Sequence, residues 1–181
     1  MSTEINLSEV KLRKIDSIEK HLYQEFKCER QELNEFLVED ALSYHEHGLT
    51  KTSLVFYNDD LVGYFSISAD RIELTPTEKD ELYINDDIQI TYFPAIKITK
   101  LAVDLKYARL GIGSYLIDLI EGMAFGLEMG IRFITLDAVN KPEVLEFYRK
   151  NGFQESLHEE RQRKQQKNRP TILMHKDIFA E

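Results

Sequence analysis

The stretch from Lys97 to Ala138 constrains the fold more than any other part of the sequence, because its hydrophobic pattern changes twice. An apolar run up to Asp104 predicts a strand, and a loop with glycines two residues apart follows it. Apolar residues then recur at helical spacing from Ser114 to Glu128, and the apolar run Ile131–Ala138 predicts a strand at the centre of a sheet. A strand, a helix and a strand in this order predict two neighbouring parallel strands.

The remaining segments predict an α/β or α+β fold built on one mixed, mostly antiparallel sheet in a single domain of 181 residues. The asparagine-aspartate turn at 58–60 predicts a hairpin. The other expected elements are a short strand at Val10–Ile15, helices at Ile18–Phe26, Leu33–Gly48 and Glu143–Lys150, a helical turn after Thr77, hairpin strands at Thr52–Tyr57 and Leu61–Ser68, strands at Ile88–Phe93 and Pro94–Asp104, and closing strands from Phe153 and at Thr171–Met174.

Composition excludes several classes of protein. Acidic residues outnumber basic ones by 32 to 23, and the net charge of −9 disfavours general binding to nucleic acids or anionic membranes. Cys28 is the only cysteine, which excludes an intramolecular disulfide and a cysteine-based metal cluster. The polar start of the chain does not resemble a signal peptide, and no apolar run approaches the roughly 20 residues of a spanning helix. A cytoplasmic protein is therefore expected.

The glycine turn is the first candidate site. Gly111 and Gly113 lie between the predicted strand and helix, where unpaired N–H groups and the positive end of the helix dipole attract phosphate. Arg109 adds a cation at the rim. No Lys-Ser/Thr pair follows the glycines, and the third glycine of a dinucleotide fingerprint is missing, so both of those phosphate-binding motifs are excluded. The alternative is a turn that only packs the helix on the sheet.

The second candidate site follows the strand Ile131–Ala138. Asn140 comes after this strand, and Tyr148 lies on the next predicted helix. A phenol at this place can act as general acid toward the thiolate that leaves a bound thioester. The alternative is a half-buried aromatic side chain with a solvated hydroxyl.

Together the two motifs make the chain resemble the GCN5-related N-acetyltransferase (GNAT) family. Gly111-Ile112-Gly113 matches its cofactor signature, and the run from Phe147-Tyr148 to Gly152-Phe153 matches its second signature. Ala108 stands at the family's Arg/Gln position, and Asn140 lies one residue further from Tyr148 than usual, with Pro142 between them. The resemblance implies a twisted sheet with a splayed parallel strand pair and helices on both faces.

The resemblance also implies the roles of the residues. Backbone groups at the end of the first strand would pair with the pantetheine arm of acetyl-CoA, amides of the turn would hold its pyrophosphate, and Tyr148 would be the general acid. No metal is implied. The implied cofactor-binding residues are Leu101, Ala102, Val103, Arg109, Leu110, Gly111, Ile112, Gly113, Ser114 and Asn140.

The N-terminal half is similar to one branch of the family, the acetyltransferase toxins that act on aminoacyl-tRNA. The similarity is carried by Phe26-Lys27-Cys28, by Leu33, Phe36-Leu37 and Ala41, and by the segment Pro94–Ile98. The physical alternative is that these apolar residues, at helical spacing, simply face the core.

Other residues bear on the acceptor. Asp70 and Glu73 are candidates for the general base by position only, and the spacing of His45 and His47 argues against a metal site. One basic cluster is either a polyanion contact or a solvated loop. Its members are Arg161, Arg163, Lys164, Lys167 and Arg169.

The expected function is transfer of the acetyl group of acetyl-CoA directly to a primary amine, with a small molecule or peptide as partner. Two alternatives stay open: a toxin that acetylates aminoacyl-tRNA, which the net charge disfavours, and a regulator that binds acyl-CoA without turnover. Edge strands near the end of the chain make a homodimer plausible. No membrane partner is expected.

Overall fold

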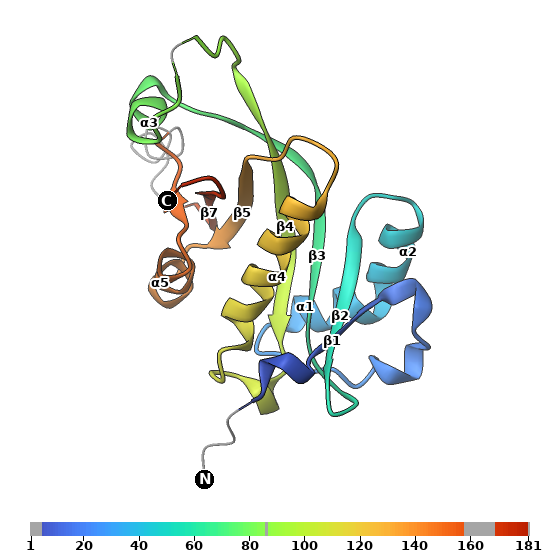
Figure 1. The fold of residues 1–181 in the computed structure, drawn as a ribbon. Coiled ribbons are helices and arrows are strands. Elements are labelled where there is room, and N and C mark those ends of the chain that lie inside the picture. The colour runs from blue at the N-terminus through green and yellow to red at the C-terminus, as the bar shows by residue number, and fades with distance from the viewer. Residues whose placement is uncertain (1–4, 86, 158–168, 181) are drawn as a thin grey trace. The chain divides into compact units, whose positions relative to one another are not determined.

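The computed structural model describes residues 5–85, 87–157 and 169–180 (Figure 1). Within these residues the strands form a seven-stranded sheet in the order β1-β2-β3-β4-β5-β7-β6. The strands are β1 Lys11–Lys14, β2 Lys51–Tyr57, β3 Asp60–Glu73, β4 Tyr92–Val103, β5 Phe133–Val139, β6 Gln154–Glu155 and β7 Thr171–Asp177. The helices are α1 Gln31–Glu35, α2 Ala41–Glu46, α3 Pro76–Glu81, α4 Ile112–Gly126 and α5 Pro142–Lys150, and a π-helical turn, Phe36–Asp40, joins α1 to α2.

The chain divides into two compact units. The first unit comprises Met1–Ser68 and Ile98–Ile120, and the second comprises Ala69–Lys97 and Glu121–Glu181. Strands β3 and β4 and helix α4 contribute residues to both units. Among the helices of the described residues, none combines the length and the apolar character needed to cross a bilayer.

The first unit packs helices on both faces of its strands. Neighbouring residues on a strand point to opposite faces. A Cβ on Gly63 would meet Leu116 of α4, whereas the Tyr64 hydroxyl donates a hydrogen bond of 2.7 Å to the carbonyl of Leu33 in α1. Six of the residues that carry the similarity to the toxin branch belong to one buried cluster around Tyr64. These residues are Phe26, Cys28, Leu33, Phe36, Leu37 and Ala41.

The second unit contains the predicted parallel pair. The backbone N–H of Arg132 donates to the carbonyl of Pro94 at 3.0 Å, and the Lys97 ammonium lies 2.6 Å from Asp137 Oδ2. Residue numbers rise together along β4 and β5, so the two strands are parallel. The pairs β1–β2, β2–β3, β5–β7 and β6–β7 are antiparallel. The mixed, mostly antiparallel sheet predicted from the sequence is confirmed.

Two neighbouring residues of β7 show that the second unit also has helices on both faces. The His175 ring lies 3.4 Å from the carboxylate of Glu78 in α3. The Lys176 ammonium lies 2.5 Å from the carboxylate of Glu121 in α4 and close to Gly152, just after α5. Helix α3 therefore covers one face of β7, and α5 with the end of α4 covers the other.

Two predicted elements differ in the structure. The segment expected to form a helix from Ile18 to Phe26 contains only a single 3₁₀ turn, Lys20–Leu22. Another 3₁₀ turn, Ile15–Ser17, precedes it, and Ile18 between the two turns is extended, with φ −123° and ψ 133°. The strand expected from Ile88 begins at Tyr92. The hairpin turn is as predicted, with positive φ values of 48° at Asn58 and 66° at Asp59.

Glu78 carries a buried carboxylate that links α3 to the start of the segment after β6. It closes a capping box with Thr75, accepts the N–H of Thr75 at 2.7 Å and the N–H of Leu157 at 2.9 Å, and faces the His175 ring. Burial alone would raise the pKa of Glu78, but the His175 ring and these N–H groups outweigh burial and lower its pKa from 4.5 to about 2.

This shift predicts a pH-dependent contribution of Glu78 to stability. Because the pKa is lower in the folded state, the contribution is complete above about pH 4.5 and is lost as the pH falls toward 2; it is worth up to roughly 3 kcal/mol. We expect the free energy of unfolding, measured with urea, to fall more steeply over this window in the wild type than in Glu78→Gln. Parallel pH profiles of the two proteins would contradict the assigned contribution.

Candidate functional site

The predicted cofactor-binding strand end, Leu101–Val103, is the last part of β4 in the first unit. The Ala102 side chain is buried in the cluster around Tyr64, so only the backbone of this residue is left to contact a ligand. Gly63 of β3 lies against it, and a Cβ on Gly63 would stand 2.8 Å from the carbonyl oxygen of Ala102. Only glycine allows the two strands to approach this closely.

The loop from β4 to α4 has a defined conformation. Asp104 caps a 3₁₀ turn, Leu105–Tyr107. After this turn, Arg109 and Gly111 have positive φ values of 63° and 84°. This conformation suits a glycine at position 111 but costs about 1 kcal/mol or more at Arg109. The Arg109 side chain is exposed. The loop therefore keeps a strained backbone at the position where the sequence predicts anion binding.

Helix α4 starts directly after the turn, and buried side chains of its first turns hold it in the core. Ile112 and Leu116 are buried, with 1% and 0% of their surface exposed. The N–H of Tyr115 in the first turn of the helix donates a hydrogen bond of 3.1 Å to the carbonyl of Gly111. The amides of Ile112, Gly113 and Ser114 precede it and have no acceptor within the helix. Together with the helix dipole, such unpaired amides attract an anion.

The other predicted site residues lie in the second unit. The Asn140 side chain donates to the carbonyl of Arg169 at 3.0 Å, and its backbone N–H donates to Pro170 at 2.9 Å, so Asn140 ties the end of β5 to the start of β7. Tyr148 is half-buried in the last turn of α5. Its ring packs edge-on against Phe147 and Phe153, with centroid distances of 5.1 and 5.6 Å, and these contacts fix its orientation.

The two candidates for the general base differ in their surroundings. Asp70 accepts a hydrogen bond of 2.5 Å from the hydroxyl of Thr135, which is fully buried on β5. Glu73 is exposed at the end of β3. A hydrogen bond therefore orients the Asp70 carboxylate. The pairing with Thr135 had no signal in the sequence, since the two residues are 65 positions apart.

The remaining sequence candidates have structural partners or lie outside the described residues. His45 is buried, accepts the N–H of Thr52 and faces Asp16, whereas His47 contacts the carbonyl of Ser43. In the part of the chain that the structure describes, no group of three or more His, Cys, Asp or Glu residues could hold a metal ion. Of the basic cluster only Arg169 is described; Arg161, Arg163, Lys164 and Lys167 lie outside the described residues.

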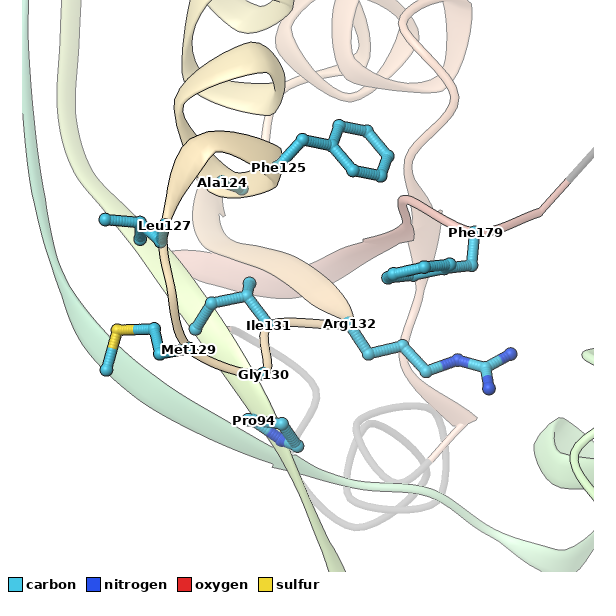
Figure 2. A pocket seen from close by; sticks show the side chains of 9 residues that line it. All are labelled: Pro94, Ala124, Phe125, Leu127, Met129, Gly130, Ile131, Arg132 and Phe179. Carbon is cyan, nitrogen blue, oxygen red and sulfur yellow. The ribbon is translucent and has the colours of Figure 1, made fainter.

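An apolar hollow of about 380 Å³ opens in the second unit (Figure 2). The exposed rings of Phe125 and Phe179 lie next to one another at its edge, 5.6 Å apart, and Arg132 is paired with Asp177. No predicted cofactor-binding or catalytic residue lines this hollow. Its lining is Pro94, Ala124, Phe125, Leu127, Met129, Gly130, Ile131, Arg132 and Phe179.

Sequence reasoning missed two residues that shape the turn. Asp104 is buried and accepts two backbone N–H groups, and Gly63 allows β3 to approach Ala102. Both left a signal in the sequence: a carboxylate directly after a strand is a common cap, and an isolated glycine inside a strand pattern indicates close backbone approach.

A strand that ends in a glycine turn at a helix N-terminus, beside a parallel strand, is typical of proteins that bind a phosphate-bearing co-substrate. Residues 53–155 match the family model described as acetyltransferase (GNAT) domain. The chain belongs to this family. It is therefore an acetyl-CoA-dependent acetyltransferase, with acetyl-CoA as its co-substrate, and the resemblance inferred from the sequence is confirmed.

Solved structures share the fold over nearly the whole chain. A structure of AtaT complexed with acetyl-methionyl-tRNAfMet has a TM-score of 0.69 and 17% identity, over 91% of this chain and 93% of that one. A tyrosine-to-phenylalanine mutant of KacT has a TM-score of 0.69 and 17% identity, over 94% and 95%. AtaTR bound with acetyl-CoA has a TM-score of 0.64 and 15% identity, over 92% and 94%. Comparison with curated protein sequences found no match.

Proposed function

We propose that this protein transfers the acetyl group of acetyl-CoA directly to a primary amine, with Tyr148 as the general acid. The observation that carries the proposal is the turn before α4, whose free amides and positive φ values fit a pyrophosphate, in a chain that belongs to the acetyltransferase family. The co-substrate supplies an activated acyl group as a thioester.

In the proposed reaction the chain's residues bind, orient and move a proton. Backbone groups of Leu101 and Val103 hold the pantetheine arm, and amides from Arg109 to Ser114 hold the pyrophosphate. The amine attacks the thioester carbonyl as a neutral base, the C–N bond forms and the C–S bond breaks. The phenol of Tyr148 gives its proton to the departing sulfur, and Asp70 or a water takes the proton that the amine loses.

A second, narrower candidate is that the amine is the α-amino group of an aminoacyl-tRNA. It is favoured by the similarity of fold to AtaT, whose structure contains acetyl-methionyl-tRNAfMet. The apolar residues of the first unit that resemble the toxin branch are buried in its core, and their burial is accounted for by packing alone. The net charge of −9 favours a small amine or peptide instead.

The acceptor can be tested with labelled acetyl-CoA and two pools of acceptors. One pool is charged tRNA, with the same tRNA stripped of its amino acid as control; the other is a panel of small amines and peptides. We expect label in at least one pool, and label in charged but not stripped tRNA would support the narrower candidate. A folded protein that binds CoA but labels neither pool would contradict the proposed transfer.

A further inference from the structure

The loop that carries the phosphate-binding turn is tied to a distant segment by Asp104. The carboxylate of Asp104 accepts the N–H of Lys27 at 3.2 Å and the N–H of Lys106 at 2.9 Å. The N–H of Leu105, the residue directly after Asp104, donates to the carbonyl of Lys27 at 2.8 Å. Both the N–H and the carbonyl of Lys27 are therefore hydrogen-bonded to the loop. Asp104 is buried, with 8% of its surface exposed.

The segment that receives this tie is itself rigid. Phe26, on one side of Lys27, is buried and packs edge-on against Tyr64 at 5.5 Å. Cys28, on the other side, donates its N–H to Asn34 Oδ1 at 2.8 Å, and Asn34 donates back to the carbonyl of Cys28 at 3.3 Å. Because both neighbours are fixed in the core, the backbone of Lys27 offers a firm anchor although its side chain is exposed.

A second, weaker tie lies further along the loop. The Tyr107 hydroxyl donates a hydrogen bond of 2.6 Å to Asp60 Oδ2, at the turn of the β2–β3 hairpin. This hydrogen bond, with partial burial and the charge of Asp60, raises the pKa of Tyr107 to about 12. The pair is exposed to solvent and therefore contributes less than the Asp104 tie.

We propose that Asp104 is a positioning residue for acetyl-CoA, acting through Lys27 of the Phe26-Lys27-Cys28 segment. Amides bind an anion well only when they already point toward it, because binding otherwise has to order the loop. Arg109 and Gly111 hold left-handed conformations that a loose loop would leave. The tie keeps the turn in this conformation before the co-substrate arrives.

This inference rests on the proposed function and explains a sequence feature that the reaction itself does not use. Phe26 and Cys28 touch no part of the turn in the hydrogen bonds described, yet they fix the residue that Asp104 holds. Asp104 does not itself contact the co-substrate in this proposal. Its carboxylate accepts two backbone N–H groups, which satisfy it within the loop.

The test compares Asp104→Asn with Asp104→Ser. Asparagine keeps the size but sets an NH₂ group against one of the two backbone donors, whereas serine keeps the cap on Lys106 and loses only the contact to Lys27. For both variants we expect the Kd for CoA, measured by calorimetry, and the KM for acetyl-CoA to rise about tenfold, equivalent to about 1.4 kcal/mol, with kcat within about threefold of the wild type.

Acetyl-pantetheine separates positioning from general damage, since it carries the thioester without the pyrophosphate. We expect its kcat/KM to be unchanged in both variants. Asp118→Asn, an exposed aspartate on α4, is the matched control and should retain wild-type affinity for CoA. Tyr107→Phe, which removes the weaker tie, should raise the Kd by about two- to threefold.

Two outcomes would overturn the inference. One is an unchanged Kd for CoA in a folded Asp104→Ser variant, and the other is an equal loss of kcat/KM with acetyl-pantetheine and acetyl-CoA. Failure of the proposed function is distinct from both, because the wild type itself would then fail to bind CoA or to transfer the acetyl group.

Discussion

Replacing Gly113 with glutamate is expected to abolish binding of acetyl-CoA while leaving the protein folded. Gly113 lies in the first turn of α4, among amides that have no acceptor within the helix. A glutamate side chain there adds bulk and a negative charge where the pyrophosphate would bind. We expect the Kd for CoA to rise at least about a hundredfold by calorimetry, a loss of about 2.7 kcal/mol.

The fold should tolerate this change, because a carboxylate near a helix N-terminus interacts favourably with the helix dipole. The matched control is Gly122→Glu, which makes the same substitution on the same helix. Gly122 is exposed, and a Cβ there meets no atom within 4 Å. The control should bind CoA like the wild type. Unchanged affinity in folded Gly113→Glu would show that the pyrophosphate binds elsewhere.

Local patterns in the sequence predict the parts of the site that depend on local geometry. The turn at Gly111, the start of α4 and the aromatic helix with Tyr148 all follow from short stretches of residues whose spacing sets their conformation. The parallel strands β4 and β5 follow from the order of elements alone.

Long-range contacts could not be predicted in this way, because they join residues that are far apart in the sequence. Asp104 and Lys27 are 77 positions apart, and Glu78 and Leu157 are 79 apart. A local pattern can mark such an acid as a cap, but only the folded backbone shows which distant N–H group its carboxylate accepts. The wrong helix prediction at 18–26 has a related cause. Tyr23 and Phe26 are buried by the core of the first unit rather than by an amphipathic helix.

Replacing Tyr148 with phenylalanine is expected to lower kcat at least about tenfold without changing the affinity for acetyl-CoA. General acid catalysis contributes roughly 10²- to 10⁴-fold in enzymes, and a thiolate that leaves without a proton donor must draw one from water. Phenylalanine keeps the ring that packs against Phe147 and Phe153, so the hydroxyl is the only group lost.

Measuring both kcat and the Kd for CoA distinguishes a proton-donor role of Tyr148 from a purely structural one. A drop in kcat with an unchanged Kd for CoA is the signature of a group that acts in the transition state, whereas a structural aromatic would leave both constants unchanged. Tyr83→Phe is the control, since the Tyr83 side chain is 95% exposed in the same unit. Equal turnover in Tyr148→Phe and the wild type would remove the proton-donor role, and the proton for the thiolate would then have to come from solvent or another residue.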